Sequence, residues 1–127
     1  MTSLRALVAA ASLCALLSPG LALGADLGAD VLAQLKNRRA DVSQRYGFEF
    51  YFYLADELSA NALARELEAK GLATRVSRGP FDPSWLCHAL VTMVPDAARL
   101  DELGRLFATL AEKHRAEFDG WEADPVR

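Results

Sequence analysis

Cysteine and the usual signatures of catalysis are scarce in this sequence. Its 127 residues include two cysteines, Cys14 and Cys87, and two histidines, His88 and His114. No HExxH, CxxC, Walker or GxGxxG pattern occurs, so the sequence predicts no metal site and no cofactor. Cys87 and His88 are neighbours on a predicted strand, so they point to opposite faces and cannot share a proton. We expect a protein without enzymatic activity.

A surplus of basic charge is also absent. The chain has 14 Lys and Arg against 17 Asp and Glu, which gives a net charge of −3. Proteins that bind nucleic acids usually concentrate Lys and Arg in a basic patch, and here the basic residues are spread along the chain. The sequence therefore predicts no direct binding of nucleic acid.

The longest apolar run lies at the N-terminus. Residues 1–5 include a basic side chain, residues 6–17 are apolar, and a Ser-Pro-Gly break then precedes small residues. This order is typical of a secretory signal peptide. We therefore predict a signal peptide over residues 1–24, with cleavage near Gly24 or Ala25.

Cleavage would release a periplasmic or secreted protein without a stable membrane anchor. An uncleaved inner-membrane anchor is the alternative, although Pro19 and Gly20 interrupt the apolar run. Only Cys87 remains after cleavage, so no internal disulfide can form.

Two segments follow the signal peptide. We predict an N-terminal helical segment over residues 25–47, docked only loosely on the rest of the protein. We predict the main domain over residues 48–127. The clearest strand alternates strictly between two faces. We expect its core face to consist of Phe48, Phe50, Phe52 and Leu54, and its other face of Glu49, Tyr51 and Tyr53.

Helix signals follow this strand. Ser59 is the predicted N-cap of a helix, with Leu58 and Leu63 forming a hydrophobic staple across it. Gly71 stands where a helix C-terminus is expected, and residues 73–78 read as a second strand. The staple and the glycine thus mark both ends of the helix.

The second half of the domain again predicts a strand followed by a helix and another strand. An apolar third strand, 85–94, ends at Pro95 because proline has no N–H for the sheet. Asp96 then caps a long amphipathic helix. Asp119 and Gly120 predict a tight turn, with a short last strand around 118–122.

The order of elements predicts an α/β (α+β) fold with a ferredoxin-like split βαβ arrangement. Its antiparallel sheet would have three to four strands, with two helices on one face, plus the N-terminal helix. The third strand would lie centrally, with His88 beside Tyr51 and Tyr53 on the open face. An exposed edge of the first strand would favour a homodimer unless the C-terminal segment covers it.

Two short motifs about 25 residues apart indicate a family. Met93-Val94-Pro95 closes the third strand, and Phe118-Asp119-Gly120-Trp121-Glu122 follows the long helix. Together with Trp85 and the acidic Asp56-Glu57, they resemble the ribonuclease E inhibitor RraB family, also called regulator of ribonuclease activity B. The resemblance implies an RraB-like domain over residues 48–127 with a ferredoxin-like fold and no catalytic activity. It also implies binding to a non-catalytic region of the ribonuclease.

The residues and the resemblance together predict a non-enzymatic regulatory module that binds a protein. With the signal peptide, the module would be exported and its partner unknown. The alternative is a cytosolic regulator that binds and inhibits ribonuclease E, with a misassigned start near Val31. An enzyme with scattered catalytic residues is a third hypothesis, which requires a pocket lined by convergent polar groups.

Candidate contact residues fall into two groups. Tyr51, Tyr53 and His88 belong to the open sheet face. We expect His88 to be half-exposed because no acidic residue is paired with it locally, and a pH-sensitive contact is the alternative. Asp119, Gly120, Trp121 and Glu122 form the C-terminal signature. In the signature, Asp119 and Gly120 would shape the turn and Trp121 would hold the long helix onto the sheet. Glu122 has no such structural role, so we predict the partner contact at Glu122 and at any exposed edge of Trp121.

Overall fold

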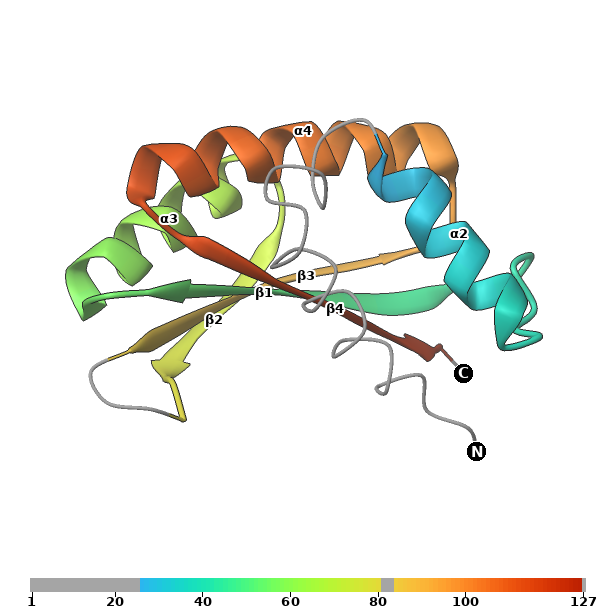
Figure 1. Cartoon of the computed structure of the whole chain (residues 1–127), viewed down its shortest axis with the longest axis horizontal. Coiled ribbons are helices and arrows are strands. Elements are labelled where there is room, and N and C mark those ends of the chain that lie inside the picture. The colour runs from blue at the N-terminus through green and yellow to red at the C-terminus, as the bar shows by residue number, and fades with distance from the viewer. Residues whose placement is uncertain (1–25, 81–83, 127) are drawn as a thin grey trace.

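A computed structural model describes residues 26–80 and 84–126 (Figure 1). The predicted signal peptide, residues 1–24, lies outside the described residues. The described chain alternates helices and strands, in the order α2 (Leu27–Asn37), β1 (Tyr46–Leu54), α3 (Glu57–Ala69), β2 (Ala73–Arg78), β3 (Trp85–Met93), α4 (Ala97–His114) and β4 (Glu117–Pro125).

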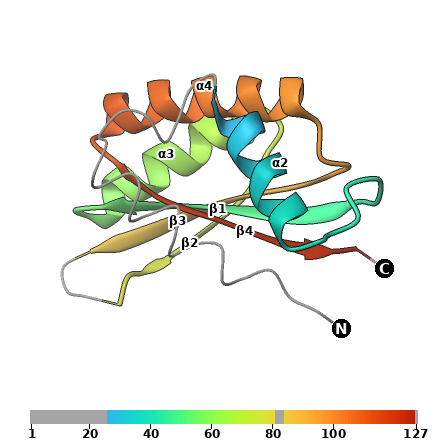
Figure 2. The same ribbon diagram turned by 45° about the vertical axis from the view of Figure 1, so that its right-hand side comes forward.

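The strands form one antiparallel sheet in the order β2-β3-β1-β4. Strand β3 therefore lies between β2 and β1, as predicted. Helices α3 and α4 cover one face of the sheet, and α2 packs on that same face (Figures 1 and 2). The predicted ferredoxin-like α+β fold is confirmed, with α2 as a third helix in the helical layer. The opposite face of the sheet, which we call the open face, has no helix of the described residues over it.

Strand β1 supplies the centre of the core. Phe48, Phe50, Phe52 and Leu54 are each at most 3% exposed, so the predicted alternation is confirmed. Phe50 and Phe52 pack against Phe107 of α4, with ring centroids 4.8 and 5.3 Å apart. The strand begins at Tyr46, two residues before the predicted start, because Tyr46 is also buried on the core side.

Helix α2 is firmly packed rather than loosely docked. Leu27, Val31 and Leu35 are each at most 1% exposed and belong to the same core as the sheet. The Gly28 N–H donates a 2.8 Å hydrogen bond to the Asp101 carboxylate of α4, which satisfies a backbone donor at the start of α2. The N-terminal helix is thus part of the packed domain.

Helix α3 begins earlier than its predicted cap. Asp56 is the N-cap, and its side chain accepts a 2.7 Å hydrogen bond from the Ser59 N–H. Leu58 is 79% exposed, so the predicted staple is wrong. The predicted C-terminus is confirmed, since Gly71 has a φ of 91° and the Leu72 N–H reaches back to the Leu67 carbonyl at 3.1 Å.

The C-terminal signature lies in a long strand and not in a turn. Strand β4 pairs with β1 along its length, and the register shifts between Phe50 and Phe52. Because Phe50 opposes Trp121 and Phe52 opposes Phe118, two residues of β4 lie opposite the single residue Tyr51. This geometry is a β-bulge, so the predicted turn is wrong. Strand β4 also covers the edge of β1, so the condition for the predicted homodimer is not met.

Candidate functional site

The open face is built from alternate residues of all four strands. Opposed residues in an antiparallel sheet point to the same side, so the pairing identifies this face row by row. One row contains Arg75, His88 and Tyr51, and the next contains Leu90, Glu49 and Glu122. Of the predicted neighbours, Tyr51 lies directly opposite His88, and Tyr53 lies on the same face one row further along, opposite Leu86.

Glu49 links His88 to Tyr51 at the centre of the open face. One carboxylate oxygen, Oε2, lies 3.0 Å from His88 Nδ1 and accepts a 3.3 Å hydrogen bond from the Tyr51 hydroxyl. The Tyr51 and His88 rings also meet edge to face, with centroids 4.5 Å apart. His88 therefore has an acidic partner, which comes from the neighbouring strand and not from its own segment of the sequence.

His88 is more buried than predicted, at 9% exposed. Burial lowers its pKa below the ordinary value of 6.5, and the Glu49 carboxylate opposes this shift without cancelling it. The charge of Arg75 on β2 lowers the pKa further. We infer that His88 is neutral at neutral pH and donates its Nδ1 proton to Glu49. The network therefore holds the Glu49 carboxylate in a fixed orientation on the open face.

The bulge places Asp119 near this face. Burial raises the pKa of Tyr53, and the nearby Asp119 carboxylate raises it further. Gly120 adopts a φ of 108°, which residues with a side chain rarely adopt. The glycine therefore permits the bulge, as its positive φ was expected to permit a turn.

The C-terminal signature is divided between the two sides of the sheet. Trp121 is fully buried on the helix side and lies beside Phe48, with ring centroids 6.2 Å apart. Its indole N–H has no hydrogen-bond partner within residues 26–80 and 84–126. Glu122 is half-buried on the open face, directly opposite Glu49. Trp121 is therefore part of the core, while Glu122 remains a candidate for contact.

Cys87 is not placed for chemistry with His88. The thiol is buried in the core, and burial raises its pKa to about 12, so it stays protonated at neutral pH. His88 points to the opposite face, as predicted. Within the described ranges, no group of three or more His, Cys, Asp and Glu residues lies in position to hold a metal ion.

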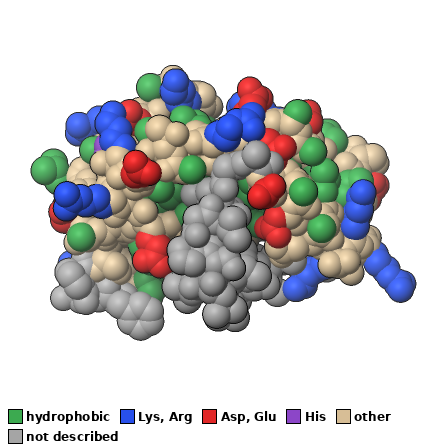
Figure 3. Space-filling model, turned by 45° about the horizontal axis from the view of Figure 1, so that its top comes forward, with side chains coloured by type: hydrophobic (Ala, Val, Ile, Leu, Met, Phe, Trp, Pro, Cys, Tyr) green, Lys and Arg blue, Asp and Glu red, His purple; other side chains and the backbone are tan. Residues whose placement is uncertain are grey.

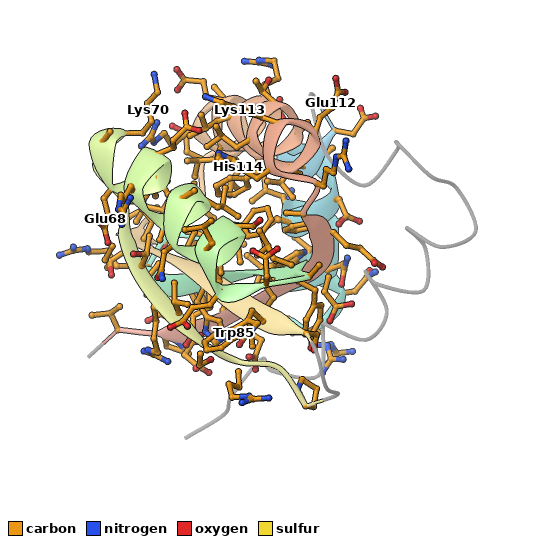
Figure 4. All side chains as sticks on the ribbon, turned by 90° about the vertical axis from the view of Figure 1, so that its left-hand side faces the viewer. Glu68, Lys70, Trp85, Glu112, Lys113 and His114 are labelled. Atoms are coloured by element: carbon orange, nitrogen blue, oxygen red, sulfur yellow. The ribbon has the colours of Figure 1, made fainter. Side chains whose placement is uncertain are left out.

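The helix-covered side of the domain carries many charged side chains. Both basic and acidic side chains are scattered over the part of its surface that Figure 3 shows. Lys113 and His114 lie at the end of α4 next to α3 (Figure 4), where both contact Glu66. The Lys113 Nζ lies 2.9 Å from the carboxylate, and these contacts lower the pKa of Glu66. The cluster therefore joins two helices and is explained by packing.

Sequence reasoning missed Glu49 as a site residue. The two-residue alternation of β1 already placed it beside Tyr51 and Tyr53. What the alternation could not supply is the contact with His88, which lies 39 residues away in the chain.

None of the helices in the described part of the chain is both long and apolar enough to span a membrane.

A family model with the description Regulator of ribonuclease activity B, RraB, matches residues 25–123. The match spans more than three quarters of the 127 residues, and it includes α2 as well as the sheet. The resemblance seen in the two sequence motifs is therefore confirmed. No curated protein matches the chain.

Proposed function

The chain belongs to the family of regulators of ribonuclease activity B, and we propose that it is a non-enzymatic regulator that binds a protein partner through its open face. The family match is the observation that carries this proposal. The match also covers the four strands that build the open face, almost to the end of β4. The fold alone would host many functions, so the family supplies the functional class.

The open face suits a protein interface. Its middle row places Tyr51, His88 and Arg75 side by side, and tyrosine and arginine are enriched where proteins bind one another. The Glu49 network fixes the Tyr51 and His88 side chains before a partner arrives, which reduces the entropy lost on binding. The other sheet face is filled by the core and cannot serve this purpose.

We propose further that the regulator is exported. The family match begins at residue 25, directly after the predicted signal peptide, which supports residues 1–24 as a separate leader. The alternative, a cytosolic inhibitor of ribonuclease E, would need a start near Val31. Such a start would remove Leu27, which is 1% exposed, and the Gly28 contact with Asp101. Both observations argue against a start near Val31.

Cell fractionation followed by sequencing of the mature N-terminus tests the location. We expect the protein outside the cytosol, with a first residue at or next to Ala25. A cytosolic protein that begins near Val31 would instead support the ribonuclease E inhibitor. For that alternative, the rate of RNA cleavage by ribonuclease E should fall when the protein is added.

A photo-reactive amino acid at two positions tests the binding face. Tyr53 lies on the open face and Arg105 is exposed on α4, so each reports one side of the domain. In cells that express the full chain, we expect a crosslinked protein from position 53 and not from position 105. Equal crosslinking from both positions would show that the open face is not the binding surface.

A further inference from the structure

Strand β2 is one of the two edge strands of the sheet, and among the described residues no strand lies along its outer edge (Figure 2). An unpaired edge presents backbone N–H and C=O groups that can bind an extended segment of another chain. The other edge strand, β4, is poorly suited to this, because its bulge distorts the edge and Pro125 has no N–H to offer. Strand β2 contains no proline, so it is the sheet edge that another chain can extend.

The hydrogen bonds between β2 and β3 show which backbone groups of β2 point outward. The Gly79 N–H donates a 3.0 Å hydrogen bond to the Ser84 carbonyl, and this pair continues the register in which Arg75 faces His88. In an antiparallel pair, residues that bond to the neighbouring strand alternate with residues whose N–H and C=O groups point away. Residues 73, 75 and 77 therefore bond to β3, whereas Thr74 and Val76 direct their backbone groups outward.

The side chains of β2 indicate what a bound segment would carry on the open face. Arg75 is exposed on that face, and it takes part in no ion pair of the described residues. In an added strand, an acidic side chain directly opposite Arg75 would form a cross-strand ion pair. The open side of the edge therefore favours Asp or Glu.

The helix side of the same edge favours apolar residues. Val76 is half-buried there and packs against the core. The Thr74 hydroxyl donates a hydrogen bond to Glu68 of α3, and this carboxylate would repel an acidic neighbour. Residues opposite Thr74 and Val76 should therefore be apolar, on either side of the acidic residue opposite Arg75.

A second copy of the chain does not supply this pattern with its own β2. The strand contains two arginines and no acidic residue, so two β2 edges side by side would bring like charges together. Strand β4 of another copy has acidic residues, but the bulge interrupts its alternation. The edge is therefore better matched to a segment of a different protein.

We propose that β2 binds an extended segment of the protein partner as an additional antiparallel strand, with an acidic side chain opposite Arg75 between two apolar residues. The inference rests on the proposed regulatory function and specifies how the partner is recognised. The added strand would continue the row that contains Tyr51, His88 and Arg75, so one partner can contact the edge and the open face together.

The test uses labelled peptides and the mature protein purified from cells that express the full chain. The parent peptide is Thr-Val-Glu-Val-Thr, in which Glu would oppose Arg75 and both Val N–H groups would point toward β2. N-methylation of both Val residues removes these donors, and we expect it to weaken binding by about tenfold or more in fluorescence anisotropy. The matched control is methylated at Glu and at the last Thr, whose N–H groups point away, and it should lose less than about threefold.

Protein variants locate the binding at β2. Thr74→Pro removes an outward N–H without breaking a bond to β3, and proline is tolerated at such edge positions. Thr74→Ala loses the same hydroxyl but keeps the N–H, so Thr74→Pro should bind the parent peptide about fivefold or more weakly than Thr74→Ala. A peptide with Gln in place of Glu should bind the wild type a few fold more weakly, and Arg75→Gln should abolish that difference.

The inference is overturned if the parent peptide does not bind, if the two methylated peptides lose affinity equally, or if folded Thr74→Pro binds like Thr74→Ala. It is also overturned if light scattering shows an oligomer that Thr74→Pro dissociates and Thr74→Ala does not, since the edge would then hold a second copy. If Thr74→Pro fails to fold, the methylated peptides still decide the question. Failure of the proposed function looks different: the peptides would behave as expected, while position 53 captures no protein in cells.

Discussion

Replacement of Trp121 by alanine tests whether the C-terminal signature stabilises the fold. The indole is fully buried and packs beside Phe48, with ring centroids 6.2 Å apart. Burial of a tryptophan removes about 150–250 Å² from water, which is equivalent to about 4–6 kcal/mol at 25 cal/mol per Å². Because alanine keeps a small part of that area, we expect Trp121→Ala to lower the free energy of unfolding by about 3–5 kcal/mol.

Thermal unfolding of the mature protein measures this loss. In a domain of this size, 1 kcal/mol shifts the midpoint by about 4 °C or more, so the expected decrease exceeds about 12 °C. Trp85→Ala is the matched control, because Trp85 is only half-buried and should cost less than half as much. A wild-type midpoint for Trp121→Ala would refute the structural role and make the signature a binding surface.

Three further changes test other parts of the structure, each by urea denaturation. Gly120→Val should cost about 1–3 kcal/mol because its φ of 108° is strained for a β-branched residue; a wild-type midpoint would argue against the bulge. Gly28→Ala should also cost about 1–3 kcal/mol because its Cβ would lie 2.3 Å from the Ala97 carbonyl oxygen; no loss would contradict the close packing of α2. The pKa of His88 is lowered from 6.5, so its contribution to stability is complete above pH 6.5 and decreases as the pH falls below it. His88→Gln should therefore lose less stability than the wild type between about pH 7 and pH 5, and an identical loss would exclude His88 as the cause.

Local patterns predicted the parts of this fold that depend on one element at a time. The alternation of β1 identified four of the five buried residues of that strand, because every second side chain points into the core. Gly71 marked the end of α3 because few other residues accept its φ of 91°. The third strand was expected in the sheet interior because it is almost continuously apolar, and β3 lies there.

The N-cap of α3 and the turn at Asp119 and Gly120 were predicted wrongly. At each place the local sequence is compatible with two structures, and a distant element determines which one forms. Asp56 and Ser59 can each cap a helix, and Asp56 is used because β1 ends at Leu54. An Asp-Gly pair suits a turn or a bulge, since both need a glycine with positive φ. The bulge forms because β1 continues alongside β4 on both sides of Asp119 and Gly120.

The contact between Glu49 and His88 was missed for the same reason. Alternation placed both residues on the open face, but their distance depends on the register between β1 and β3. In the observed register Tyr51 opposes His88, and Glu49 reaches His88 diagonally, at 3.0 Å. A single sequence does not specify that register, so His88 looked unpaired.

The bulge also explains why the signature can serve the core and the open face together. Phe118 and Trp121 are three residues apart, so in a regular strand they would point to opposite faces. The extra residue at the bulge restores the alternation, and both rings reach the core, opposite Phe52 and Phe50. The same shift leaves Glu122 opposite Glu49 on the open face. Gly120→Val should therefore displace the Glu122 carboxylate as well as lower the free energy of unfolding.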